Sequence, residues 1–210
     1  MIGIMIPVYE RPEYFQQTIN SLLASNLKGC MICIVDDGSK NKELKKIYHN
    51  FIIQYIPIIK IIKENNVGMW DSMRLGFDTL IEYGCDKLIN LDSDVIVKSN
   101  WVPIMDELLE KHSDRIISGF NKSLDINTVK EYDNYVKKTH VGGVSMMFTK
   151  ETYNERVKQH LTSDLWDLDL SRYLQEKKFY YYVTKPSVVQ HIGQIGKNSS
   201  LNNYDYADDY

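Results

Sequence analysis

The chain has 210 residues, of which 43% are hydrophobic and 25% are charged, and this ordinary globular composition excludes intrinsic disorder for the bulk of the sequence. Its 25 Lys and Arg stand against 28 Asp and Glu, so the formal net charge is −3, which lacks the basic excess that nucleic-acid binding draws on. We therefore expect one globular domain and no nucleic-acid partner.

The first half of the chain alternates short apolar runs with amphipathic segments, which is typical of strands and crossover helices in a parallel sheet. The expected strands cover 2–9, 31–37, 56–62 and 87–97, and the expected helices cover 12–25, 41–51 and 68–83. The most apolar stretch, 51–62, is interrupted by Gln54, Pro57 and Lys60 and is too short for the roughly 20 residues of a bilayer core. It predicts a buried strand and no membrane span.

The second half is less regular. We expect a helix at 102–111, a strand at 115–120, a charged connection through about Lys138, a strand at 143–149, a helix at 167–176 and an apolar strand at 178–184. The sequence after Pro186 is rich in Gly, Ser and Asn, which is typical of a loop or tail.

Polar residues follow three of the expected strands at their carboxyl ends. These are Tyr9-Glu10-Arg11, Asp36-Asp37-Gly38-Ser39 and Asp92-Ser93-Asp94. Open α/β sheets bind ligands outside the carboxyl ends of their strands, so the three segments predict one site with the geometry of a nucleotide site.

The pair Asp92 and Asp94 is the most informative of these features. Strand alternation is expected to turn both side chains to the same face, and two carboxylates at a buried strand end are costly unless a cation or a donor neutralises them. Carboxylate oxygens are hard ligands that suit Mg²⁺ or Mn²⁺. Taken alone, the pair also fits a solvated turn after a strand.

The cysteines indicate a reducing compartment. Cys30, Cys33 and Cys85 are odd in number and lie in apolar runs, so we expect buried thiols and a cytoplasmic location. A zinc or redox site at Cys30 and Cys33 would need a second ligand pair, which the sequence lacks. The N-terminus has no basic leader, so we expect no signal peptide.

An ordered set of motifs resembles the GT-A fold, family-2-like nucleotide-sugar glycosyltransferases. The motifs are IPVYERPEYFQQTINSLLAS, IVDDGSKN, ENNVGMWDSMRLGFD, INLDSDVIV, VGGVSMMF and WDLDLSRYLQEKK. The resemblance spans roughly residues 2–195 and implies a single α/β catalytic domain over 1–195, with a Rossmann-like, mostly parallel central sheet and helices on both faces. It leaves 196–210 as a flexible C-terminal segment, in which Lys197, Ser199 and Ser200 could close over the donor as a lid.

The resemblance also implies where the nucleotide sugar binds. Pro7, Tyr9 and Arg11 would wrap the base, Asp36 and Asp37 would lie near uracil and ribose, Asn66 and Gly68 would approach the nucleotide, and Arg74 would point toward phosphate or Asp92. The plainer alternatives are a surface charge for Arg11, an ordinary turn for Asp36-Asp37-Gly38, and a helix-surface ion pair for Arg74.

The same resemblance implies the metal and acceptor residues. Asp92 and Asp94 would hold Mn²⁺ or Mg²⁺ on the donor diphosphate with Ser93 beside them, and His191 would complete the metal site, unless it is a structural histidine. The absent side chains of Gly142 and Gly143 would let the acceptor approach, unless the pair only begins a strand. Trp166 occupies the place of the first acidic residue in the family's ED motif, and it could contact the acceptor sugar.

Asp167 would be the general base that takes the acceptor proton in a single inverting displacement. Asp164 and Asp169 are rivals for that role, and an acidic residue that only stabilises the helix N-terminus is the alternative for Asp167. The implied activity is metal-dependent transfer of a hexose from a UDP-sugar, such as UDP-glucose, to a glycan or other hydroxyl acceptor.

Three alternatives stay open at this point. They are a retaining transferase of the same fold, a haloacid-dehalogenase-like phosphatase with Asp92-Ser93-Asp94-Val95 as its nucleophile motif, and a non-catalytic nucleotide-sugar-binding module. Dehydrogenase and P-loop functions are excluded, because no GxGxxG follows the first strand and no GxxxxGK(S/T) occurs.

Overall fold

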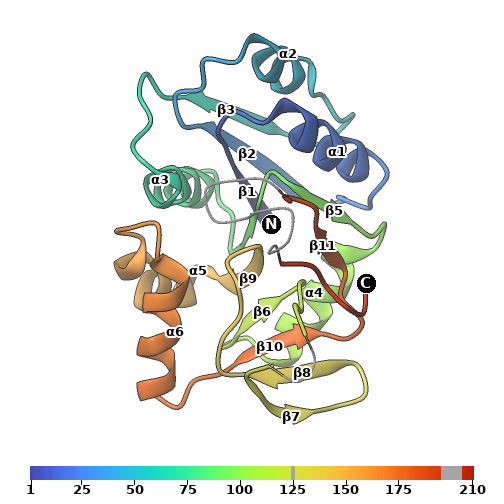
Figure 1. Cartoon of the computed structure of the whole chain (residues 1–210), viewed down its shortest axis with the longest axis vertical. Helices are drawn as coiled ribbons and strands as arrows, with labels where there is room; N and C mark the ends of the chain where they lie inside the picture. Colours follow the sequence, from blue (N-terminus) through green and yellow to red (C-terminus); the bar gives the residue numbers. More distant parts are fainter. Residues whose placement is uncertain (124–125, 195–204) are drawn as a thin grey trace.

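A computed structural model describes residues 1–123, 126–194 and 205–210. It contains a nine-stranded sheet in the order β3-β2-β1-β4-β9-β6-β10-β8-β7 and a two-stranded sheet made of β5 and β11 (Figure 1). The strands of the large sheet are β1 (Ile2–Val8), β2 (Cys30–Asp36), β3 (Ile58–Ile62), β4 (Lys87–Leu91), β6 (Ile116–Ser118), β7 (Thr128–Glu131), β8 (Tyr135–Lys138), β9 (Ser145–Thr149) and β10 (Tyr181–Thr184). The small sheet pairs β5 (Val95–Val97) with β11 (Val189–His191).

The helices lie on both faces of the large sheet. They are α1 (Pro12–Leu23), α2 (Lys42–Asn50), α3 (Met69–Glu82), α4 (Trp101–Lys111), the single turn α5 (Lys150–Thr152) and α6 (Trp166–Glu176), with a π-helical turn at Tyr153–Val157 and a 3₁₀ turn at Lys158–His160. One buried apolar cluster contains residues of α1, α2 and α4, and a second contains residues of α3 and α6. The alternating side chains of β1 divide between the two clusters, as strand geometry requires.

The expected α/β architecture is confirmed. The pairings place seven of the nine strands in one direction, and β9 and β8 run the other way. The carboxyl ends of β1, β2, β4 and β6 therefore share one edge of the sheet with the start of β9. The polar segments that the sequence places after β1, β2 and β4 meet at that edge.

Two expected strands are wrong in part. The run 51–62 forms a strand only at β3, an edge strand, and Tyr55 is 91% exposed in the turn before it. The run 87–97 is two strands, because the backbone leaves the large sheet at Asp92 and β5 pairs with β11 instead. The loop expected after Pro186 contains β11 for the same reason. Hydrophobicity alone predicted continuous strands because it does not show where a strand changes partners.

The charged connection expected through Lys138 is also wrong. It contains the hairpin of β7 and β8 at the edge of the sheet. The outer strand β7 is mostly exposed, and charged side chains on an edge strand oppose pairing with other molecules. Stacked rings of Tyr132, Tyr135 and Tyr182 hold the hairpin on β10.

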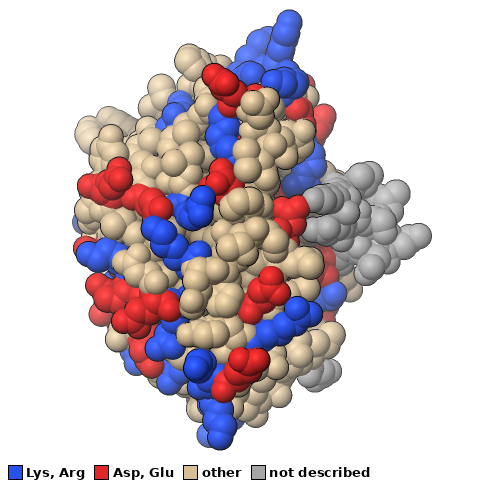
Figure 2. Space-filling model, turned by 90° about the vertical axis from the view of Figure 1, so that its left-hand side faces the viewer, with Lys and Arg blue, Asp and Glu red and all other residues tan. Residues whose placement is uncertain are grey.

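The cysteines are buried, as expected, and the surface carries charges of both signs. All three cysteines are buried and unbonded, and burial raises the pKa of Cys30 and of Cys33 to about 12. Lys and Arg are interspersed with Asp and Glu over the face that carries α3 and α6 (Figure 2). Among the helices of the described residues, none is long and apolar enough to cross a bilayer.

Candidate functional site

A cavity of about 950 Å³ opens at the edge of the sheet where the polar strand ends meet. Most of the residues singled out in the sequence line this cavity. They are Pro7, Tyr9, Arg11, Asp37, Asn66, Gly68, Asp92, Ser93, Asp94, Gly142, Gly143, Trp166, Asp167 and His191. Asp36 and Arg74 do not line it, and Lys197, Ser199 and Ser200 lie outside the described residues.

The chain turns sharply into the cavity after β1. Glu10 and Arg11 both have left-handed backbone conformations, with φ of 52° and 55°. Such conformations are uncommon for residues with a side chain, and they cluster where a site requires a particular geometry. The turn places the Arg11 guanidinium over the acid pair, 2.8 Å from Asp94 Oδ2.

The two acids have opposite surroundings. Burial disfavours the charge of Asp94, but His191 and Arg11 outweigh burial and lower the pKa of this carboxyl. Burial and the charge of Asp94 raise the pKa of Asp92 well above its ordinary value, and no described residue donates a hydrogen bond to its carboxylate. Asp92 therefore has a deficit of positive charge that a bound cation would fill.

His191 is oriented by the C-terminal segment. Its Nδ1 lies 2.7 Å from the carbonyl oxygen of Asp205, which can only accept, so Nδ1 carries a proton. Its Nε2 lies 3.4 Å from Asp94 Oδ2. Burial lowers the pKa of His191, but the contact with Asp94 prevails and raises it to about 9, so the ring is protonated at neutral pH.

The donor set of Asp92, Asp94 and His191 fits a divalent cation. With Nδ1 protonated, a neutral His191 would present the Nε2 lone pair toward Asp94, and both groups could then ligate one ion. As the described residues stand, no three His, Cys, Asp or Glu side chains are arranged as a metal site. The contacts of Arg11 and His191 with Asp94 supply positive charge there instead.

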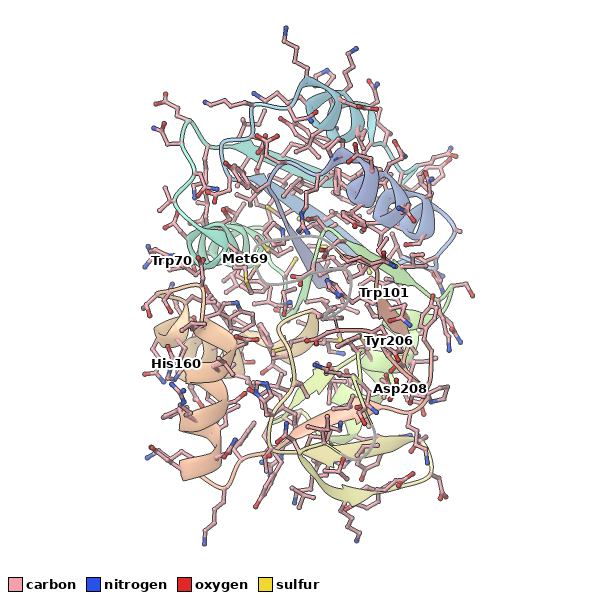
Figure 3. All side chains as sticks on the ribbon, in the orientation of Figure 1. Met69, Trp70, Trp101, His160, Tyr206 and Asp208 are labelled. Carbon is pink, nitrogen blue, oxygen red and sulfur yellow. The ribbon has the colours of Figure 1, made fainter. Side chains whose placement is uncertain are left out.

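Asp37 organises the loop before α3. Its carboxylate accepts hydrogen bonds from the Val67 and Gly68 backbone at 3.0 and 2.8 Å, and from Lys63 Nζ at 2.5 Å. Gly38 permits the close packing of this loop, because a Cβ there would lie 2.5 Å from the backbone of Asn65. Asp37 therefore shapes the cavity wall at Gly68, where α3 begins and Met69 and Trp70 lie in its first turn (Figure 3).

Asp36 and Arg74 are engaged elsewhere. Asp36 is 1% exposed and accepts hydrogen bonds from Tyr48 Oη and the Ser39 backbone, both at 2.9 Å. Arg74 pairs with Asp71 at 3.3 Å on the surface of α3, and its guanidinium lies over the ring of Trp70. Asp36 therefore fixes the turn after β2. Arg74 forms a helix-surface ion pair, which was the alternative to its predicted position near the phosphate or Asp92.

The opposite wall of the cavity is built on α6. Asp167 Oδ2 accepts a hydrogen bond from Gly143 N at 3.2 Å, which holds the carboxylate beside the start of β9. Asp164 also lines the cavity, whereas Asp169 pairs with Arg172 on the surface of the helix. Trp166 is only 1% exposed, and its ring packs against Gly143.

Gly143 is required by packing, and Gly142 is not. A Cβ on Gly143 would lie 2.6 Å from Cζ2 of Trp166, whereas among the described residues a Cβ on Gly142 would meet only Val144, at 3.9 Å. Apart from the two chain neighbours, no other described residue lies within 4 Å of that Cβ position, and Gly142 lines the cavity.

Several residues of the site were not predicted from the sequence, and three of them have informative contacts or positions. Asn90 is fully buried, donates to the Gly143 carbonyl at 2.5 Å and accepts from Met146 N at 3.2 Å. Lys63 holds Asp37, and His140 lines the cavity near Asp167. Of these three, only Asn90 could have been recognised from the sequence, because a polar residue within an apolar strand needs a hydrogen-bond partner when it is buried.

Comparison with known proteins identifies related sequences. The sequence model of the family described as glycosyl transferase family 2 matches residues 3–168. The chain is 25% identical over 122 residues to the glycosyltransferase GlyG of Streptococcus pneumoniae, covering 57% of this chain and 39% of that protein. It is 24% identical over 161 residues to an undecaprenyl-phosphate 4-deoxy-4-formamido-L-arabinose transferase of Proteus mirabilis, covering 72% of this chain and 44% of that protein.

Two solved structures share the fold. A crystal structure of residues 1–349 of S. aureus TarS aligns with a TM-score of 0.65 at 15% identity, covering 90% of this chain and 59% of that one. A crystal structure of GalNAc-T7 with UDP, GalNAc and Mn²⁺ aligns with a TM-score of 0.69 at 14% identity, covering 91% of this chain and 43% of that one. The chain thus spans less than two thirds of the length of these proteins, from 39% to 59%.

Proposed function

The chain belongs to glycosyltransferase family 2, and on that premise we propose that it transfers a hexosyl group from a UDP-sugar to a hydroxyl group of an acceptor. The observation that carries the proposal is the arrangement of the cavity. The acid pair Asp92 and Asp94 lines one part of it, and Asp167 lines another part on a separate element, α6. A haloacid-dehalogenase-like phosphatase finds no support in the family match.

The donor nucleotide would occupy the part of the cavity between β1 and α3. Tyr9 is 47% exposed there and offers a ring face for a base, and the loop held by Asp37 brings the Gly68 backbone to the same wall. The relative GalNAc-T7 was crystallised with UDP, which supports uridine as the base.

Asp92, Asp94 and His191 would hold a divalent ion, Mn²⁺ or Mg²⁺. Such an ion supplies positive charge to the diphosphate leaving group. The raised pKa of Asp92 supports this assignment, because its carboxylate accepts no hydrogen bond from a described residue and a cation would favour its charged form. Arg11 contributes a further positive charge at the same place.

Asp167 would accept the proton of the acceptor hydroxyl as its oxygen attacks the anomeric carbon. The bond from oxygen to the anomeric carbon forms, the bond to the diphosphate breaks, and the configuration inverts in one displacement. The backbone N–H groups of Gly143 and Leu168 each donate to one carboxylate oxygen of Asp167, at 3.2 and 2.9 Å, and orient a residue that lines the cavity. Open space above Gly142 leaves room for the acceptor.

A screen of UDP-hexoses with Mn²⁺, with Mg²⁺ and with a chelator tests the proposal. A native-state ligand raises the melting temperature, so the true donor should do so only with the metal present. Transfer is then followed with a panel of glycan acceptors, and proton NMR of the first-formed product reports its anomeric configuration. A retained configuration would reassign Asp167, and binding without transfer or hydrolysis would identify a non-catalytic module.

A further inference from the structure

The segment between β8 and β9 is fastened to one face of α6. Three hydrogen bonds join Gly143 N to Asp167 Oδ2 at 3.2 Å, His140 Nδ1 to Ser171 Oγ at 2.8 Å, and Gln175 Nε2 to the Thr139 carbonyl at 3.3 Å. The three helix residues are spaced four apart, so their side chains project from the same face. The His140 ring is thereby held about one helical turn from Asp167, in the wall of the same cavity.

A chain of hydrogen bonds leads to His140 from the core. Tyr181 is fully buried, and its hydroxyl lies 3.0 Å from Ser171 Oγ. Among the described residues Ser171 is its only hydrogen-bond partner. A buried hydroxyl proton without an acceptor is costly, so Tyr181 donates to Ser171.

The direction of these hydrogen bonds determines which ring nitrogen of His140 carries the proton. Ser171 has one hydroxyl proton, and among the described residues its only other contact is Nδ1 of His140, so it donates there. A neutral imidazole that accepts at Nδ1 carries its proton on Nε2. No described residue forms a hydrogen bond with that Nε2, so among these residues the N–H of His140 has no partner.

The charges around His140 favour the neutral ring. Burial lowers the pKa of His140, the carboxylates of Asp167 on α6 and Asp205 in the C-terminal segment raise it, and Lys138 on β8 lowers it. The outcome is a lowered pKa, so the ring is neutral at pH 7. Protonation would also force Nδ1 to donate to Ser171. The Ser171 hydroxyl could then no longer donate to His140, and the series of hydrogen bonds that begins at Tyr181 would be disrupted.

We propose that His140 is an acceptor-binding residue whose Nε2–H donates a hydrogen bond to the oxygen of the attacking hydroxyl. This inference rests on the proposed function and deepens it. A hydroxyl has one proton and two lone pairs. If the proton goes to Asp167 and one lone pair accepts from His140, the remaining lone pair faces the anomeric carbon. His140 keeps its own proton throughout, and Asp167 receives the one that the acceptor loses.

The tautomer can be measured without any substrate. Long-range ¹H–¹⁵N NMR of the labelled protein near neutral pH distinguishes Nε2–H from Nδ1–H imidazole, and the spectrum of His140→Gln assigns the signal among the five histidines. We expect His140 as the Nε2–H tautomer, with the Nδ1–H form gaining in Tyr181→Phe, where Ser171 no longer has to accept. An Nδ1–H or doubly protonated His140 in the unmodified chain would overturn the proposal.

The role in acceptor binding is tested by kinetics. His140→Leu should raise the acceptor KM about tenfold or more and leave the affinity for UDP unchanged, whereas His140→Gln, which keeps an N–H donor, should recover part of the loss. His112→Gln is the control, because His112 packs on Tyr182 outside the cavity. An unchanged acceptor KM in His140→Leu, or no difference between the Leu and Gln variants, would refute the role. If no sugar is transferred at all, the proposed function fails, while the NMR result still decides the tautomer.

Discussion

The guanidinium of Arg11 lies 2.8 Å from Oδ2 of Asp94, and this contact brings the turn after β1 onto the acid pair that follows β4. Asp94 is also 3.4 Å from His191 Nε2, so one acid has two positively charged neighbours. Its neighbour Asp92 has no hydrogen-bond donor among the described residues. The pair is therefore electrostatically uneven, and Arg11 competes for the oxygen that a metal ion would bind.

Replacing Arg11 by Gln should strengthen the binding of Mn²⁺ to the protein without nucleotide, by roughly three- to tenfold, because a charged competitor leaves Asp94. Isothermal titration with Mn²⁺ measures the change. Arg172→Gln is the control, since Arg172 pairs with Asp169 on the surface of α6. Asp94→Asn should abolish the binding. Weaker Mn²⁺ binding in Arg11→Gln would show that Arg11 supports the metal site and does not compete with it.

Asp167→Asn should lower the rate of transfer by about 10²- to 10⁴-fold, the range for a lost general base, and leave UDP binding intact. The fold should persist with a small loss of stability, because the Asn side-chain oxygen can still accept from Gly143 N and only the hydrogen bond from Leu168 N to the other carboxylate oxygen is lost. Asp169→Asn is the matched control two residues along the same helix. It changes an acid that pairs with Arg172 outside the cavity, so its activity should stay within about twofold of the unmodified chain. Equal losses in both variants would remove Asp167 from the mechanism.

Substitution by Ala should have different effects at the two adjacent glycines, Gly142 and Gly143. Gly143→Ala should destabilise the protein by about 1–3 kcal/mol, because the new methyl group would overlap the buried ring of Trp166. Gly142→Ala should leave the stability within about 0.5 kcal/mol, because the space above Gly142 is open. Urea unfolding of the two variants checks this difference. A fall in acceptor affinity confined to Gly142→Ala would then locate the acceptor.

The convergence of the acid pair with Arg11 could be predicted because strand ends of a parallel sheet meet at one edge, whatever the packing of the helices. The position of Asp36 outside the cavity could not be predicted, since its carboxylate accepts a hydrogen bond from Tyr48, a residue of α2 that packs there only in the folded protein. The same holds for His140, whose neighbours Ser171 and Tyr181 come from α6 and β10. Local patterns located the motifs, and long-range contacts decided which side chains face the cavity.

Lys63→Met should weaken nucleotide binding by loosening the loop before α3. Lys63 lies 2.5 Å from Asp37 and 2.9 Å from Asp71, so its loss leaves two carboxylates close together without their shared cation. We expect the dissociation constant for UDP to rise about tenfold, measured by titration. Arg74→Gln is the comparison, because Arg74 also pairs with Asp71 but lies outside the cavity, and its affinity should be unchanged. An equal effect of both variants would mean that Asp71, and not the Asp37 loop, governs binding.

The buried His140 predicts a pH dependence of stability. Its pKa is lowered from the ordinary 6.5 in the folded protein, so the unfolded chain binds the proton more tightly. The contribution of His140 to stability is therefore fully present above pH 6.5 and is lost as the pH falls below that value. His191, whose pKa is raised to about 9, acts in the opposite sense, and its contribution declines as the pH rises toward 9.

The difference between the unmodified chain and His140→Gln isolates the His140 contribution, because His191 is common to both. Urea unfolding over a series of pH values should show that the advantage of the unmodified chain shrinks as the pH falls from neutral toward about 5, with a slope of at most about 1.4 kcal/mol per pH unit. An advantage that grows in acid would mean that the attraction of Asp167 and Asp205 outweighs burial and that His140 is charged in the folded protein.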